Sequence, residues 1–224
     1  MSFGGVVVDQ INPVERFIGR SQLVGMLANA LGWDHRDAAR MNALQATVRH
    51  ASRWDVEPER VVDYHTVDLG QDFMIDSGWT TRGIREDRGG ANSRATHQRY
   101  RHYWANGCAT VAMTLIEGGA PNLSDLEASL RRPARPLFIG RKTCLPASPV
   151  LLGHRSAPNL LAALKAEPLA NPGPRQAPSR IAGCWPVEDE PTEHTLEMYD
   201  LRDWRNNLHR GRQRYAVGFL EAPE

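Results

Sequence analysis

Residues 98–116 read QRYRHYWANGCATVAMTLI, and this stretch decides the fold that the sequence predicts. From Cys108 to Ile116, apolar side chains recur at every other position, which is the period of a β-strand with one buried face. The pair Asn106-Gly107 separates this run from a strand-like segment at 98–104. Asn-Gly between two strands predicts a tight β-hairpin.

The elements expected on either side of this hairpin complete an α+β fold with helices packed on an antiparallel sheet. A second hairpin is expected before it, from strands at 47–56 and 61–67 joined by Glu57-Pro58-Glu59-Arg60. Helices are expected from a Ser21 cap to Leu31, at 37–45, from a Ser124 cap to Pro133 and at 159–165. Further strands are expected at 137–139, 181–187 and 214–220.

Length and composition indicate one soluble domain with a sizeable core. The chain has 224 residues, of which 41% are hydrophobic, and no apolar run approaches the roughly 20 residues of a membrane span. The first residues, MSFGG, lack the charged and apolar segments of a signal peptide, so a cytoplasmic location is expected. Three scattered cysteines give neither a disulfide framework nor a CxxC metal site.

The charges nearly cancel, yet they are segregated along the chain. There are 27 basic residues, 25 of them Arg, against 26 acidic ones. An excess of Arg over Lys has two interpretations: a GC-rich genome, or a requirement for the planar guanidinium, which binds phosphate. Residues 128–166 carry seven positive charges and no carboxylate, and further Arg clusters lie at 82–101 and 205–214, whereas acids concentrate at 188–203. One such block is usually solvated surface, but three together favour a polyanionic partner.

The segment from Asp68 to about Thr96 shows no periodicity and several glycines, as is typical of a functional or a disordered insertion. The strand that follows it places Arg99, Arg101 and Tyr103 on one face by its two-residue period. Two guanidiniums beside a ring suit a nucleic-acid chain, although a ring-covered salt-bridge site is an equally common reading.

Motifs for phosphate cradles, zinc proteases and serine hydrolases are absent from the sequence. His97 and His102, five positions apart in a strand, fall on opposite faces, which argues against a shared metal. His65, beside Tyr64 at a strand end, is the best candidate for general acid or base chemistry. A hydrogen-bonded structural histidine is the commoner reading of such a position.

Three segments, in order and with similar spacing, resemble the CasD family of the RAMP superfamily, subunits of the type I-E CRISPR interference complex (Cascade). They are GRS at 19–21, DYHTV at 63–67, and FIGRKTCLP at 138–146 followed by PVLLG at 149–153. RED at 85–87 and RHY at 101–103 also fall where that family has similar residues. The likeness covers most of residues 1–165 and returns weakly at 204–218.

This resemblance implies a ferredoxin-like, RRM-like RAMP domain at 1–167 that includes a long basic hairpin, the thumb, at about 61–105. A Pro-rich linker or loop at 168–180 and a C-terminal strand extension at 181–224 would complete the chain. Family members usually begin with an apolar strand ahead of the segment that matches Ser2-Phe3-Gly4. The first family strand is therefore expected to be missing, through a late start assignment or a trimmed chain.

The function implied is a non-catalytic subunit, without metal or cofactor, that binds the 5′ handle of the guide crRNA and caps the backbone of the complex. Expected partners are the backbone subunit and the large PAM-reading subunit, with target DNA only indirectly and no membrane. The RNA-binding residues expected are Arg20, Tyr64, His65, Arg85, Arg99, Arg101, Tyr103, Arg141 and Lys142.

Two alternatives stay open at this point. One is a metal-independent endoribonuclease that processes CRISPR repeat RNA, an activity of a related subfamily. Tyr64 and His65 would then be the acid and base, and Lys142 would stabilise the phosphate charge. The other alternative is a general RNA-binding module without preference for the repeat.

Overall fold

A five-stranded antiparallel sheet in the order β6-β1-β7-β11-β8 forms the centre of the protein. The computed structural model describes residues 1–6, 11–68, 96–116, 120–170 and 179–222, and the backbone of two short strands, β3 (Gly78–Trp79) and β4 (Arg85–Glu86). The sheet strands are β1 (Val48–Val56), β6 (Cys108–Leu115), β7 (Arg180–Pro186), β8 (Thr195–Met198) and β11 (Gln213–Glu221). A small hairpin, β9 (Arg202–Asp203) with β10 (Leu208–His209), lies outside this sheet.

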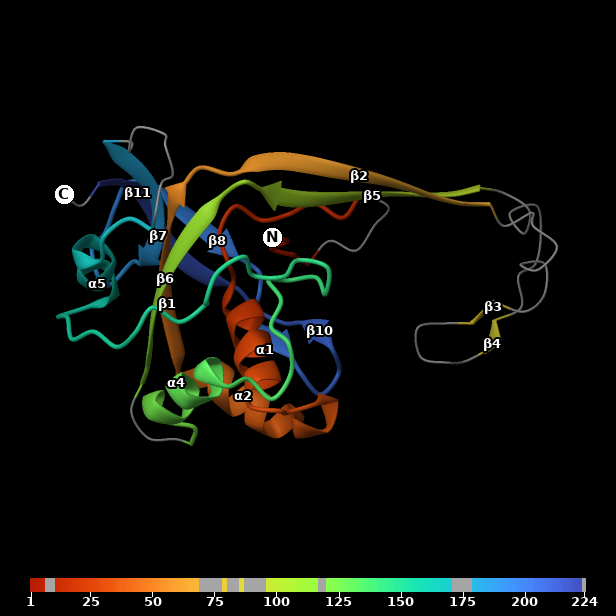
Figure 1. Ribbon diagram of the computed structural model, residues 1–224, viewed down its shortest axis with the longest axis horizontal. Coiled ribbons are helices and arrows are strands. Elements are labelled where there is room, and N and C mark those ends of the chain that lie inside the picture. Colours follow the sequence, from red (N-terminus) through yellow and green to blue (C-terminus); the bar gives the residue numbers. More distant parts are fainter. Residues whose placement is uncertain are drawn as a thin grey trace.

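Helices cover both faces of the sheet, which explains why β1 is buried along almost its whole length. Val48 of β1 packs in a cluster with residues of α1 (Arg20–Ala30), α2 (Ala38–Thr47) and α4 (Leu123–Arg131). Ala51 points the other way and packs with α5 (Leu160–Ala166). Figure 1 shows α5 apart from the other three helices. The α+β prediction is confirmed, and no helix among the described residues is long and apolar enough to cross a membrane.

The helices occur where the sequence predicts them, but two of the predicted caps are wrong. Helix α1 has Gly19 as its N-cap, and the Ser21 side chain makes no capping hydrogen bond. Instead, the backbone N–H of Ser21 donates to the Asp200 carboxylate at 3.3 Å, so a distant acid replaces the local cap. Helix α4 begins after Asn122, whose side chain and that of Asp125 form a capping box, and not at a Ser124 cap.

The predicted Asn106-Gly107 hairpin is wrong, and so is the hairpin at 57–60. The strands exist, but β1 pairs with β6, while β2 (Glu59–Asp68) pairs with β5 (Thr96–Ala105). A type I′ turn needs φ above zero at both central residues, whereas here only Asn106 has it, at 54°. Asn106-Gly107 and Glu57-Pro58 instead lie opposite each other as a bend in one long two-stranded ribbon.

Close packing at this bend explains why a glycine follows Asn106. A Cβ added to Gly107 would lie 2.6 Å from the Cβ of Pro58 and 3.1 Å from the Trp54 ring. Register also shifts between Trp54 and Val56, which leaves Asp55 as an extra residue in the bulged strand. At this bend the pair of strands turns away from the central sheet and the helices, and β2 and β5 continue as a two-stranded ribbon (Figure 1).

Buried polar groups tie the segment after α5 to β1. Arg53 is fully buried and donates to Asp55 at 2.6 Å, to the Glu167 carbonyl at 2.7 Å and to the Pro168 carbonyl at 2.9 Å. The Leu164 carbonyl accepts from it as well. The first residues of the predicted Pro-rich linker are therefore held against the sheet, whereas residues 171–178 lie outside the described part of the chain.

The remaining strand predictions are confirmed for 181–187 and 214–220, which match β7 and β11, and wrong for 137–139. Ile139 lies in a turn region, where its carbonyl accepts from the Ser2 N–H at 3.1 Å. The neighbouring Met1 exchanges two backbone hydrogen bonds with Trp104 of β5. The turn that contains Ile139 is thus brought to the base of the β2–β5 ribbon.

Candidate nucleic-acid interface

The β2–β5 ribbon extends out of the body, and most of its side chains are open to solvent. Its two strands pair through ten directly opposed residues, from Glu59 with Ala105 to Asp68 with Thr96. All ten residues of β2 are exposed, and Figure 1 shows the ribbon extending away from the sheet and helices. Such a two-stranded ribbon gains little stability from burial, which indicates that its surface is kept for contacts with other molecules.

One face of the ribbon carries Arg99 and Arg101. Directly opposed residues of an antiparallel pair share a face, so His65 lies with Arg99, and Arg101 with Asp63. Tyr103, two residues beyond Arg101, belongs to the same face. We call this surface, formed by His65, Arg99, Arg101 and Tyr103, the basic face. No carboxylate of the described residues lies within ion-pair distance of Arg101, even though Asp63 is its cross-strand neighbour.

The opposite face of the ribbon is mainly uncharged and aromatic. Tyr64 is opposed to Tyr100, with ring centroids 5.0 Å apart, and the two residues are 54% and 41% exposed. Val62 is 47% exposed on the same face. Tyr64 and His65, which the sequence groups as one acid-base pair, therefore point to opposite sides of β2. This geometry does not bring them together on one phosphate, as the endoribonuclease alternative requires.

At the base of the ribbon, the turn that follows Ile139 extends the basic face. The Arg141 guanidinium lies over the Tyr103 ring at 4.7 Å from its centroid and donates to the His102 carbonyl at 3.2 Å. Lys142 is the next residue and is exposed. Arg141 is thus a predicted site residue that the fold brings to Tyr103 from a distant part of the sequence.

Arg60 is a further basic residue at the base of the ribbon, on the face of Val62 and Tyr64, and sequence reasoning misses it because residues 57–60 are expected to form a turn. Its Nε donates to Nδ1 of His102 at 2.9 Å, so this nitrogen of the imidazole carries no proton. Desolvation lowers the pKa of His102, and the positive charges of Arg60 and Arg141 lower it further. His102 is therefore a neutral structural link at the base of the ribbon.

Arg20 is not brought to this surface, and the side chain of Arg85 lies outside the described residues. Arg20 is buried, 8% exposed, in a polar cluster with Asp200, His50 and Tyr215. Burial lowers the pKa of Arg20 and raises that of Asp200, as expected for charges withdrawn from water. Arg85 belongs to β4, of which only the backbone is described, so its side chain lies outside the described residues.

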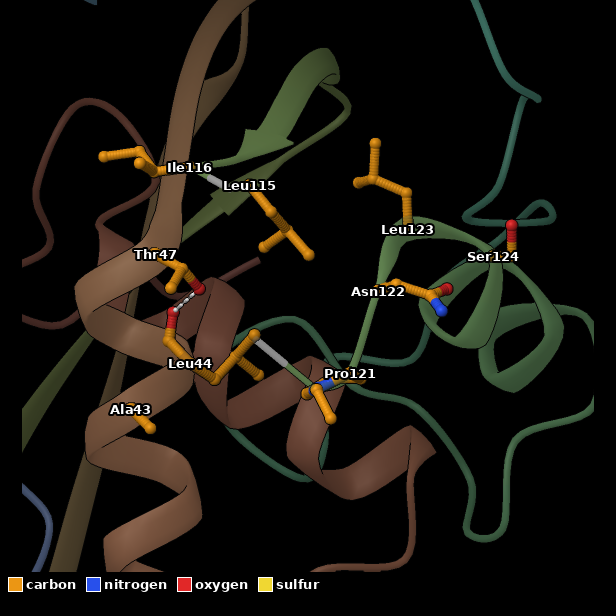
Figure 2. Close-up of a pocket in the computed structure, with 10 residues that line it drawn as sticks. Ala43, Leu44, Thr47, Leu115, Ile116, Pro121, Asn122, Leu123 and Ser124 are labelled. Atoms are coloured by element: carbon orange, nitrogen blue, oxygen red, sulfur yellow. Dashed lines mark hydrogen bonds between the residues drawn. The ribbon is translucent and has the colours of Figure 1, made fainter. Parts of the chain in front are cut away.

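Two further features of the described residues concern metal binding and cavities. No three His, Cys, Asp or Glu side chains among them are grouped closely enough to hold a metal ion. A hollow of about 410 Å³ lies between the end of α2, the end of β6 and the start of α4 (Figure 2). It is lined by Leu44, Leu115, Pro121 and other residues without titratable side chains.

Comparisons with known proteins agree with this architecture. A family model described as CRISPR-associated protein (Cas_Cas5) matches residues 1–215. The chain is 28% identical over 215 residues to the CRISPR system Cascade subunit CasD of Escherichia coli strain K12, covering 91% of this chain and 89% of the relative. Among solved structures, a chain of a CRISPR RNA-guided surveillance complex superposes with a TM-score of 0.70 at 23% identity, over 99% of this chain and 86% of that one.

A second structure, described as a Cas protein, has a TM-score of 0.60 at 21% identity, over 99% of this chain and 89% of that one. Both superpositions support the fold, and the family model covers nearly the whole sequence. The chain belongs to the family of CRISPR-associated proteins described by that model.

Proposed function

We propose that this protein is a non-catalytic subunit of a CRISPR RNA-guided surveillance complex, in which it binds the 5′ handle of the guide RNA. The family membership and the CasD relative support a place in such a complex. The observation that carries RNA binding is the basic face, on which Arg99 and Arg101 alternate with Tyr103 and lead to Arg141. Guanidiniums neutralise phosphates, and rings of this kind stack on unpaired bases.

In this proposal the β2–β5 ribbon is the thumb of the family, and the RNA follows its basic face toward the body. Arg99 and Arg101 lie on the same face of the ribbon as His65, so the RNA strand is expected on that side. Other subunits of the complex, among them the backbone and large subunits, are the expected protein partners. Target DNA would be reached only through the guide RNA.

The experiment that tests this function compares RNA binding by the full-length protein and two Arg variants. Arg101→Ala should weaken binding of the repeat-derived 5′ segment of the guide RNA by about 1 to 3 kcal/mol and reduce the salt dependence by about one phosphate contact. Arg131→Ala is the matched control, because Arg131 is also exposed but forms an ion pair with Glu127 on α4. Its affinity should stay unchanged.

Co-expression with the other subunits and a CRISPR array provides the second part of the test. The protein should be recovered in the assembled particle together with guide RNA. Absence of the chain from that particle, or equal binding to repeat-derived and scrambled RNA, would contradict the proposed function. Cleavage of repeat RNA in EDTA would support the endoribonuclease alternative in its place.

A further inference from the structure

The dipeptide Asn106-Gly107 lies at the bend between the ribbon and the central sheet, outside the paired strands. Strand β5 ends at Ala105 and β6 begins at Cys108, so both residues fall between the two ladders. Asn106 is exposed, and no backbone hydrogen bond from the Gly107 N–H is found among the described residues. The side-chain amide of Asn106 and the backbone nitrogen that follows it are therefore both open to reaction.

The fold requires these two residue types at the bend. Asn106 has φ of 54°, a conformation that asparagine, aspartate and glycine adopt far more readily than other residues. A Cβ on Gly107 would lie 2.6 Å from the Cβ of Pro58 and 3.1 Å from the Trp54 ring. Packing against the facing strand thus keeps a glycine directly after the asparagine, and most less reactive pairs would strain the bend.

An asparagine amide is attacked most easily when the next residue is glycine. The attacking group is the backbone nitrogen of the following residue, and the carbon attacked is the asparagine Cγ. Any other residue carries a side chain that crowds this approach and restricts its backbone, whereas glycine does neither. Asn106 is therefore the asparagine of this bend whose amide the neighbouring backbone is best able to displace.

The reaction needs water as its only partner. The Gly107 nitrogen gives up its proton and bonds to Cγ of Asn106, the bond from Cγ to Nδ2 breaks, and the amide group leaves as ammonia. The cyclic imide that results is then opened by water at one of its two carbonyl carbons. Opening at one carbon gives aspartate, and opening at the other gives isoaspartate, whose backbone runs through Cβ. Because the attacking nitrogen must lose a proton, base accelerates the ring closure.

Both products change the contacts at the bend. The Asn106 amide donates to Oε2 of Glu59 at 3.3 Å, so aspartate at this position would place a second carboxylate beside that of Glu59. Like charges at this separation repel each other, and the hydrogen bond is lost as well. Isoaspartate also lengthens the backbone by one atom between β5 and β6, opposite the close contact of Gly107 with Pro58. The bend is thereby loosened.

We propose that Asn106 is a site of spontaneous deamidation and isomerisation, and that this modification loosens the bend that orients the ribbon. Exposure of the amide, the following glycine and the position outside the ladders support the reaction. The contacts with Glu59 and Pro58 support its effect on the bend. The inference concerns the chain itself and does not depend on RNA binding.

Peptide mass spectrometry of the folded, full-length protein after incubation in mildly alkaline buffer tests the reaction. Trypsin releases residues 102–131 as one peptide, which contains both Asn106 and Asn122. Asn122 is the internal control, because it precedes Leu123 and its side chain caps α4. Asn106 should convert severalfold faster than Asn122, with isoaspartate among the products. Equal conversion at the two positions, or conversion of Asn106 only after unfolding in urea, would overturn the proposal.

Hydrogen exchange of the amides beside the bend tests the effect of the modification. Exchange should become severalfold faster in the incubated protein than in the fresh protein, because the contacts at the bend are weakened. Asn106→Gly is the matched control, since glycine accepts the positive φ and has no amide to lose, and its exchange should not change on incubation. Fresh Asn106→Asp should show the effect of charge alone, and adding Glu59→Gln should relieve it. Unaltered exchange in protein that has converted at Asn106 would overturn the effect on the bend.

Discussion

Replacement of Arg53 by Met is the most direct test of how the body of the protein is held together. Arg53 is fully buried, and its guanidinium pairs with Asp55 and donates to the carbonyls of Leu164, Glu167 and Pro168. The substitution keeps much of the side-chain length but leaves the Asp55 carboxylate buried without its cation. It also removes the donors of three carbonyls between α5 and the segment that follows it.

The expected cost follows from the chemistry of the buried pair. Removing one partner of a buried ion pair destabilises a protein by about 3 to 5 kcal/mol, a large fraction of the roughly 5 to 15 kcal/mol that stabilises a typical domain. Asp55 keeps two donors, Thr110 Oγ1 at 2.6 Å and the Ala170 N–H at 2.8 Å, which argues for the lower end. With a urea m-value of about 3 kcal/mol/M, the unfolding midpoint should fall by about 1 M.

Urea unfolding followed by tryptophan fluorescence measures this change, and two further variants sharpen the result. Arg131→Met removes an exposed ion pair with Glu127 and should cost less than about 1 kcal/mol. The double variant Arg53→Met/Asp55→Asn should be more stable than Arg53→Met alone, because it no longer buries an unpaired charge. A loss below about 1 kcal/mol for Arg53→Met would refute the account of a buried, fully bonded guanidinium.

Two other predictions concern the bend and the core. Gly107→Ala should destabilise the protein by about 1 to 3 kcal/mol, because the new Cβ would lie 2.6 Å from that of Pro58; an unchanged thermal unfolding midpoint would contradict this packing. Burial lowers the pKa of His50 from 6.5 to about 4, so the unfolded chain binds a proton there that the folded chain does not. Stability should therefore fall by up to about 3 kcal/mol as pH falls from 6.5 to 4. His50→Gln should remove this share of the pH dependence, and identical pH profiles of unfolding for the two proteins would disprove it.

The strands of the ribbon are correctly predicted from the sequence, but their predicted pairing is wrong. The alternation in 108–116 and the turn residues around Pro58 are local signals, and each marks a real strand or a real interruption. Which strand pairs with which is decided by contacts between residues 28 to 67 positions apart, and a local Asn-Gly pattern carries no information on these. Asn106-Gly107 and Glu57-Pro58, each of which predicts a hairpin turn, are therefore the two sides of one bend.

The caps and buried charges show the same limit of local reasoning. Ser21 has the right chemistry for an N-cap, yet Asp200, far along the chain, takes the Ser21 N–H. The neighbouring Arg20 is predicted to bind RNA from its place in a family motif, but the fold buries it beside the Asp200 carboxylate. A single sequence does not distinguish a buried arginine from an exposed one unless its distant partner is known.

The candidate interface was predicted in part. The two-residue period of β5 correctly grouped Arg99, Arg101 and Tyr103 on one face, because side-chain alternation is a property of the strand alone. The position of Arg141 over Tyr103 depends on a turn that reaches the ribbon through Ser2 and Ile139, and this contact has no local signature.

The continuity of β1 with β2, and of β5 with β6, also has a mechanical consequence. Ten residues of paired strand reach about 30 Å, so a molecule held at the outer end of the ribbon acts on the body through a long lever. The two strands of the ribbon continue into β1 and β6 at one side of the central sheet. A force along the ribbon is therefore shared by many backbone hydrogen bonds at once. A sideways load instead concentrates at the bend beside Gly107, where the ladder is interrupted. We therefore expect the ribbon to resist stretching along its length and to bend most easily beside Gly107.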